Sequence, residues 1–73
     1  MAKTSLVALQ REIGRAVAKA RLRQGLTQQG LARELGTRQA NISRIERGLQ
    51  NLSLDLLLRL SHVLDLRLHL RVK

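Results

Sequence analysis

The stretch that decides the fold is Gln28–Arg47, QQGLARELGTRQANISRIER. Thr27, just before it, is a good N-cap, because its hydroxyl can accept a hydrogen bond from a free backbone N–H of the first helical turn. Apolar residues then recur at helical spacing as far as Gly36, which adopts the left-handed conformation of a helix end without a Cβ clash. After a short turn, Ile42 and Ile45 mark the buried side of a second helix. The spacing predicts two short helices joined by a tight turn, a helix-turn-helix.

The composition favours a polyanionic partner. Fourteen Lys and Arg against five Asp and Glu give a net charge of +9 on 73 residues, and a basic chain this short usually binds nucleic acid or an anionic membrane. No apolar run approaches the roughly 20 residues of a membrane-spanning helix. The chain also has no aromatic residue on which single-stranded bases could stack. Double-stranded DNA is therefore the expected partner, and no membrane contact is expected.

The length and the start of the chain predict one domain over residues 1–73. Such a domain is marginal, because a chain of about 60 residues buries only about 60% of its unfolded surface, so a second subunit would stabilise it. Residues 1–4 lead into an Arg-rich helix pattern rather than the apolar core of a signal peptide. The absence of cysteine removes any disulfide framework and permits a cytoplasmic location.

Two more helices are expected on either side of the motif. Residues 5–24 carry an apolar stripe at three- and four-residue steps that ends before Gly25. Gly14 lies inside that helix at a cost of about 0.5–1 kcal/mol relative to Ala, and only a close contact would explain it. A further helix begins at the N-cap Ser53 and is expected to end near Asp65. Its apolar residues cover more than half of its circumference, which is more than one small core can use.

In the last residues the spacing of the apolar side chains changes from a helical repeat to alternation. Aliphatic side chains alternate strictly with basic and histidine side chains over residues 66–72, which predicts a β-strand. A lone strand leaves backbone groups unpaired, so we expect it to pair with its copy in a second subunit and to cover the excess apolar surface of the preceding helix. A frayed tail is the other interpretation. The residues expected in this dimerisation strand are Leu66, Leu68, Leu70 and Val72.

No pattern indicates catalysis or metal binding. His62 and His69 are the only histidines, one in an expected helix and one in the expected strand. They have no cysteine or acidic cluster beside them, and the chain has no Gly-rich phosphate loop and no nucleophile–base pair. The protein is therefore expected not to be an enzyme and to need no cofactor and no metal.

Residues 21–48, RLRQGLTQQGLARELGTRQANISRIERG, resemble the Cro/C1-type (XRE) helix-turn-helix domains of phage repressors and bacterial regulators. The pieces R-x-x-x-G-L-T-Q, L-A-x-x-L-G and I-S-R-I-E-R-G are highly specific together, and the following LSLDLLLRLSHVLDL matches the next helix of that domain. Leu52 departs from the pattern, since many members have Pro before the capping Ser. The resemblance implies an all-α, lambda repressor-like fold of four helices with the helix-turn-helix at residues 28–47.

The resemblance also implies which residues touch DNA. The second helix of the motif, the recognition helix, enters the major groove, where Arg suits guanine and Gln suits adenine because each binds in a bidentate way. The residues that match base-reading positions are Arg38, Gln39, Ala40 and Arg44. The residues expected at the DNA backbone are Gln28 and Arg47, which match family phosphate contacts, and Asn41 and Ser43 on the flanks of the helix. A solvated polar side chain is the alternative for each.

Two further groups of charges need separate interpretations. Arg21 and Glu46 match a family salt bridge between the first helix and the recognition helix, and a partly buried bridge is expected here; an exposed pair worth about 0–1 kcal/mol is the alternative. A basic row also steps by four along the first helix, where like charges are mutually unfavourable. It is interpreted as a solvated face, with DNA backbone or an acidic partner as alternatives. The row is Arg11, Arg15, Lys19 and Arg23.

Taken together, these features predict a sequence-specific transcriptional repressor that binds an inverted repeat in operator DNA as a homodimer. The alternating tail is similar to that of HipB-type antitoxins, whose dimers are clasped by a two-stranded sheet and which bind a HipA-type kinase toxin. That resemblance implies the antitoxin and autoregulator of a toxin–antitoxin operon, with a kinase-like toxin as a candidate partner. The alternatives are a module that mainly neutralises a toxin, and a phage-like or restriction-control regulator without a toxin.

Overall fold

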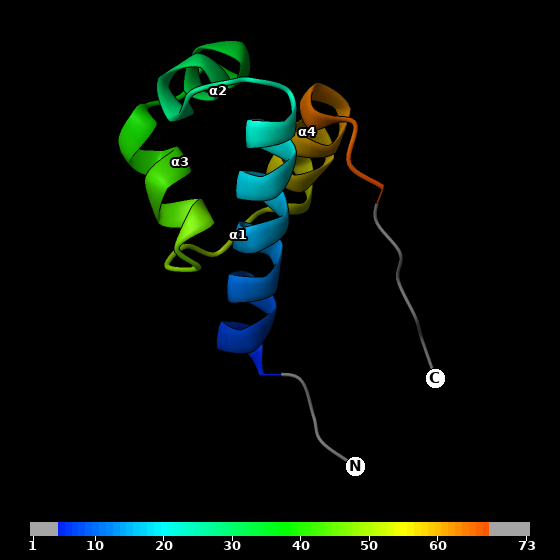
Figure 1. Ribbon diagram of the computed structural model, residues 1–73. Helices are drawn as coiled ribbons and strands as arrows, with labels where there is room; N and C mark the ends of the chain where they lie inside the picture. The colour runs from blue at the N-terminus through cyan, green and yellow to red at the C-terminus, as the bar shows by residue number, and fades with distance from the viewer. Residues whose placement is uncertain (1–4, 68–73) are drawn as a thin grey trace.

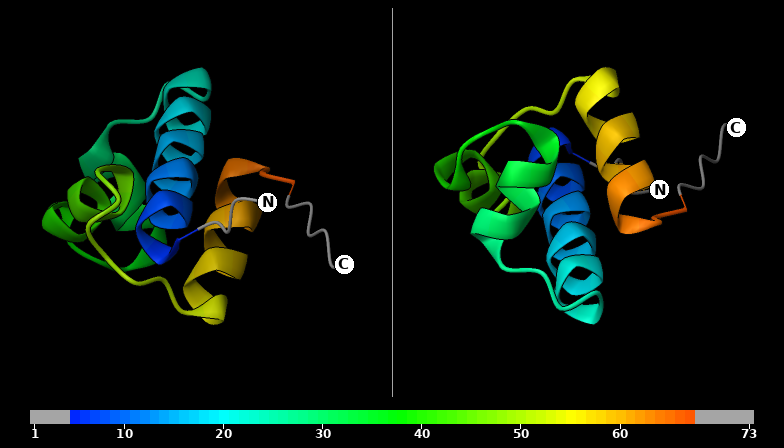
Figure 2. Two further views of the ribbon diagram at one scale, coloured as in Figure 1. Left: turned by 90° about the horizontal axis from the view of Figure 1, so that it is seen from below. Right: turned by 90° about the horizontal axis from the view of Figure 1, so that it is seen from above.

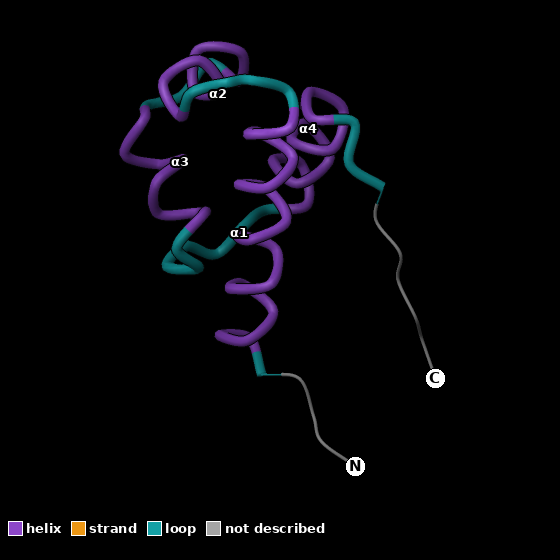
Figure 3. Tube along the Cα trace, in the orientation of Figure 1, coloured by secondary structure: helices purple, strands orange, loops and turns teal. Residues whose placement is uncertain are grey.

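A computed structural model describes residues 5–67 of the chain. Over these residues the chain forms four helices and no strand (Figure 3). Helix α1 runs through the middle of the molecule, α2 crosses near its C-terminal end, and α3 and α4 lie on opposite sides of it (Figures 1 and 2). The helices are α1 (Leu6–Arg23), α2 (Gln28–Leu35), α3 (Gln39–Glu46) and α4 (Leu54–Leu64). The all-helical fold and the helix-turn-helix at α2 and α3 agree with the sequence prediction.

Three of the helices begin at a hydroxyl side chain. The Oγ of Ser5, the Oγ1 of Thr27 and the Oγ of Ser53 each accept a hydrogen bond from the backbone N–H three residues on, at 3.0, 2.9 and 3.0 Å. Such a cap is worth about 1 kcal/mol. The predicted caps at Thr27 and Ser53 are confirmed. Arg38, which precedes α3, makes no side-chain cap bond.

All four helices end in one common type of turn. A residue with positive φ reverses the chain, and the next amide N–H donates to the carbonyl five residues earlier, at 2.8–3.0 Å, which satisfies carbonyls that the helix itself leaves free. The reversing residues are Gly25 (φ 71°), Gly36 (φ 68°), Gly48 (φ 73°) and Asp65 (φ 52°). Asp65 therefore marks the exit of α4, as the sequence indicated.

All four helices contribute to one apolar core, so α3 is held in place by its buried side. Its buried side chains are Val17, Ala20, Leu31, Ala32, Leu35, Ile42, Ile45, Leu60 and Leu64. The guanidinium of Arg59, on α4, donates to the carbonyl oxygen of Leu35 and so ties α4 to the end of α2. None of the helices between residues 5 and 67 is both long and apolar enough to cross a membrane.

Gly14 lies where the backbones of α1 and α3 touch. A Cβ at this position would lie 2.7 Å from the carbonyl oxygen of Glu46 and closer still to that of Ile45. Only glycine therefore allows the two helices to approach this closely. This contact is the reason, unavailable from the sequence, for a glycine in the middle of a helix.

Part of the exposed side of α4 is apolar. Leu54 is 84% exposed and Leu58 is 53% exposed, although a surface helix usually places its apolar residues inward. The expectation that α4 carries more apolar surface than the core uses is therefore confirmed. Helix α4 itself lies on the opposite side of α1 from α3 (Figure 2).

The expected strand falls mostly outside the described residues. Its remaining members, Leu68, Leu70 and Val72, lie beyond residue 67, and the two residues that are described, Leu66 and Arg67, are not in a strand. The left-handed turn at Asp65 brings Leu66 back onto the core, and its N–H donates to the carbonyl oxygen of Ser61 at 2.8 Å. The assignment of Leu66 to a strand is therefore wrong, because this residue completes the end of α4.

Candidate nucleic-acid interface

The outer face of α3 carries the residues expected to read bases. Ile42 and Ile45 are buried against the core, so the helix presents its other side to solvent. The exposed residues there are Arg38, Gln39, Ala40 and Arg44. A single exposed helix of this kind has the dimensions that the major groove of B-DNA admits.

Three of the residues expected at the DNA backbone surround this face. Arg47 is exposed directly after α3, and its Nε donates to the carbonyl oxygen of Ser43 at 3.4 Å. Asn41 and Ser43 are half-buried on the flanks of the helix. The amide nitrogen of Asn41 donates to Oγ1 of Thr37 at 2.7 Å, so Asn41 closes the turn before α3. The sequence analysis did not identify this local role, although an amide four residues after a threonine is a signal for it.

An ion pair joins α1 to α3 behind the candidate interface. Nε of Arg21 lies 2.6 Å from Oε2 of Glu46, and an Arg21 Nη2–Glu46 Oε1 bond of 3.1 Å makes the pair bidentate. The two side chains are only 12% and 7% exposed. Nη1 of Arg21 also donates to the carbonyl oxygen of Leu26 at 2.8 Å, just before α2. The expected bridge is thus present, and it is largely buried.

Gln28 extends this ion pair towards the surface. Its Nε2 donates to Oε1 of Glu46 at 3.0 Å, and its Oε1 lies 3.5 Å from the donor Nε2 of Gln39. A continuous chain of polar contacts therefore runs from Arg21 through Glu46 and Gln28 to the first residue of α3. From the sequence, only a phosphate contact is expected of Gln28. Its half-buried side chain also positions Gln39.

The charges on this surface are almost all positive. Within residues 5–67 the bridge between Arg21 and Glu46 is the one ion pair, so no acidic side chain neutralises the exposed guanidinium groups of Arg38, Arg44 and Arg47. Such groups suit both phosphate oxygens and guanine O6 and N7. In the part of the chain that the structure describes, no group of three His, Cys, Asp or Glu side chains could hold a metal ion.

Known proteins share this arrangement. The family described as Helix-turn-helix matches residues 17–70, which include both helices of the motif. The restriction-modification controller protein C.AhdI from Aeromonas hydrophila has a similar structure, with a TM-score of 0.77 and 31% sequence identity over 84% of this chain and 88% of that protein. No curated protein sequence matches the chain. The chain therefore belongs to the Cro/C1-type (XRE) helix-turn-helix family of DNA-binding regulators.

Proposed function

We propose that this protein represses transcription by binding an inverted repeat in double-stranded DNA as a homodimer. The observation that carries the proposal is the exposed face of α3, whose polar side chains project from a helix that the core and the Arg21–Glu46 bridge hold in place. Two such helices related by a two-fold axis read half-sites about one helical turn, roughly 34 Å, apart.

The side chains of this surface divide into two roles. Arg38 and Arg44 read guanine, Gln39 reads adenine N6 and N7, and the methyl group of Ala40 contacts thymine, because these pairings match the edges that bases present in the major groove. Contacts with phosphate oxygens fix the position of the protein but carry no sequence information. The residues that make them are Gln28, Asn41, Ser43 and Arg47.

The dimer forms on the side of α1 that lies away from α3. The exposed Leu54 and Leu58 of α4 support this assignment, as does an adjoining groove of about 360 Å³ between α1 and α4. Its apolar lining residues include Leu6, Leu9, Leu52 and Leu57. The alternating residues 68–72, which follow the core-packed Leu66, would extend this apolar contact by pairing with their copy, as a two-stranded ribbon between the subunits.

Two genetic settings are candidates for the repressor. We favour the control of a restriction–modification operon, because the similar controller protein matches over nearly the whole length of both chains. An antitoxin that regulates its own operon is the second candidate, and the alternation of residues 66–72 favours it. Neighbouring methyltransferase and endonuclease reading frames support the first setting, and a kinase-like reading frame supports the second.

Selection from random duplexes, followed by gel shift, tests the DNA-binding proposal. We expect an inverted repeat to be enriched, and we expect log K to fall with log salt by about 0.9 for each phosphate that the protein neutralises. A scrambled duplex of the same composition is the control. Recovery of no inverted repeat, or equal affinity for the scrambled duplex, would overturn the proposal. Affinity capture from the native host then separates the settings, since co-purification of a kinase-like protein identifies the antitoxin.

A further inference from the structure

The basic row on α1 does not face in one direction. Its members, Arg11, Arg15, Lys19 and Arg23, are spaced by four residues, and a step of four turns about 40° beyond one full turn of an α-helix. Three steps therefore rotate the row by about 120°. The first and last members cannot both face the same neighbouring helix.

Two glycine contacts show which end of the row lies beside α3. A Cβ on Gly48 would lie 2.7 Å from Cγ and 2.8 Å from Cα of Arg11, so the stem of Arg11 packs against the residue that follows Arg47. Gly14, where α1 touches α3, directly precedes Arg15 in the sequence. The beginning of the row is therefore held at the C-terminal end of α3.

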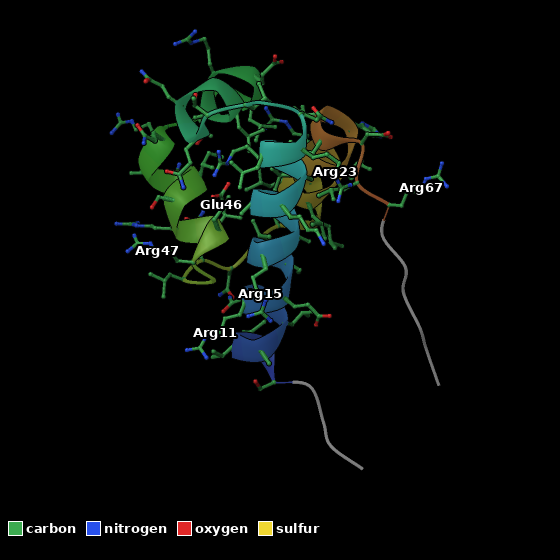
Figure 4. All side chains as sticks on the ribbon, in the orientation of Figure 1. Arg11, Arg15, Arg23, Glu46, Arg47 and Arg67 are labelled. Carbon is green, nitrogen blue, oxygen red and sulfur yellow. The ribbon has the colours of Figure 1, made fainter. Side chains whose placement is uncertain are left out.

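Figure 4 shows the same division. Arg11 and Arg15 lie on the part of α1 beside the end of α3, with Arg11 on the side from which Arg47 emerges, whereas Arg23 lies at the opposite end of α1, towards α4. Glu46 is also at the end of α3, but its carboxylate points inward and is bound by Arg21. The positive charge of the first two row members is therefore not neutralised by the nearest acid of α3.

The remaining acid near these arginines is Glu12, on α1 itself. It lies three residues before Arg15, which makes the two side chains neighbours on the helix surface, but it forms no ion pair within residues 5–67. Arg11, Arg15 and Arg47 are all exposed, and none of them takes part in an ion pair within residues 5–67. Together these three guanidinium groups make up a basic surface that spans the end of α3 and the adjoining part of α1 (Figure 4).

We propose that Arg11 and Arg15 contact the phosphate backbone of the DNA duplex beside the contact of Arg47, while Lys19 and Arg23 stay in solvent. The inference rests on the proposed DNA-binding function and enlarges the interface by a second helix. DNA is the favoured partner over an acidic protein because the basic surface is continuous with α3 and is rich in the groups that bind phosphate.

The chain offers a matched control for this proposal. The double variant Arg11→Gln with Arg15→Gln and the double variant Lys19→Gln with Arg23→Gln each remove two charges from the same helix. Glutamine keeps a Cγ atom at position 11, the side-chain atom that lies beside Gly48. Binding to a fluorescently labelled duplex that carries the selected inverted repeat is followed by anisotropy over a series of KCl concentrations. Far-UV circular dichroism checks that each variant is folded.

We expect the Arg11/Arg15 variant to have a flatter salt dependence. The magnitude of the negative slope of log K against log salt should fall by about 1.8 per subunit, since each lost phosphate contact removes about 0.9. Base preference stays unchanged, and Arg11→Lys, which keeps the charge, stays near the unmodified slope. The Lys19/Arg23 variant keeps the unmodified slope. Equal slopes for the two double variants, whether both fall or neither does, overturn the inference. If the unmodified chain binds no duplex specifically, the proposed function itself is wrong, and this inference with it.

Discussion

Nε of Arg21 and Oε2 of Glu46 lie 2.6 Å apart, in a pair that joins the first helix of the chain to the recognition helix α3. The carboxylate of Glu46 accepts two bonds from Arg21 and one from Gln28. These bonds fix the end of α3 from inside, while its outer face stays free. The stability of the fold and the orientation of the proposed DNA-reading surface therefore depend on the same carboxylate.

Removing one member of this ion pair should destabilise the fold strongly. Glu46→Leu leaves the guanidinium of Arg21 largely buried without its counter-ion, a loss of about 3–5 kcal/mol for a buried pair, against a total stability of about 5–15 kcal/mol. The double variant Arg21→Met with Glu46→Leu should lose much less than the sum of the two single variants. Urea unfolding, followed by far-UV circular dichroism, measures all three. Additive losses would contradict this account of the pair.

Gly14→Ala should separate α1 from α3. Its Cβ would overlap with the carbonyl oxygens at the end of α3, and overpacking of this kind costs about 1–3 kcal/mol. Gly30→Ala is the control, because a Cβ there would meet no backbone atom, only the side-chain atoms Oγ1 of Thr27 at 3.2 Å and Cδ2 of Leu26 at 3.7 Å. We expect the control to shift the melting temperature little. Equal behaviour of the two variants would show that the helices can move apart without cost.

Asp65→Gly should stabilise the end of α4. Asp65 is the one non-glycine residue with positive φ between residues 5 and 67, and glycine removes the Cβ strain of the left-handed conformation, which is about 1–2 kcal/mol for an ordinary residue and less for aspartate. The expected net gain is below about 1 kcal/mol, because the larger conformational freedom of glycine in the unfolded chain opposes the relief of strain; it is seen as a slightly higher melting temperature. Gly36→Ala, at a similar φ of 68°, should have the opposite effect. A lower melting temperature for Asp65→Gly would mean that its carboxylate stabilises the turn.

Substitutions on α3 should separate base reading from backbone contact. Arg44→Ala and Gln39→Ala should each lose about 1–3 kcal/mol of binding free energy and relax the preference at one base pair. Arg47→Ala should instead weaken binding to all sequences alike and flatten the salt dependence. Titration of the selected duplex and its single-base variants distinguishes these outcomes. A change of base preference in Arg47→Ala but not in Arg44→Ala would mean that α3 lies in the groove in a different orientation.

Removal of residues 68–73 tests the tail without disturbing the core. The cut after Arg67 retains Leu66, which packs on the core. If the tail joins two subunits, the truncated chain should move towards monomer, melt at a lower temperature and bind the inverted repeat more weakly, because burying each aliphatic side chain contributes about 1.5–3 kcal/mol. Light scattering measures the oligomeric state of the truncated chain, and thermal unfolding measures its melting temperature. An unchanged dimer of unchanged stability would place the whole interface on α4 and its surroundings.

The features that follow from local chemistry could be predicted from the sequence. Thr27 and Ser53 cap helices, and Gly25 and Gly36 end them, because these residues satisfy or shape the backbone within one turn of the chain. The first helix, expected over residues 5–24, is observed as Leu6–Arg23. The outward face of α3 also followed from its buried isoleucines.

The features that depend on distant parts of the chain could not be predicted in the same way. Gly14 is explained only by the backbone of α3, and Gln28 only by the carboxylate of Glu46. Leu66 fitted an alternating pattern, but the turn at Asp65 directs it to the core. The spacing of the basic row was visible, but its division between two sides of α1 requires the position of α3.

The contact at Gly14 has a mechanical consequence. Where α1 meets α3, backbone touches backbone, so no side chain can change rotamer there and let α3 shift. Helices α1 and α3 are therefore expected to move as one unit, to which the shared core attaches α4. In a dimer joined through α4, the distance between the two recognition helices would then be fixed by the protein. An operator with the wrong spacing could be accommodated only by bending or twisting the DNA, so the discrimination between spacers would follow the sequence-dependent stiffness of the duplex.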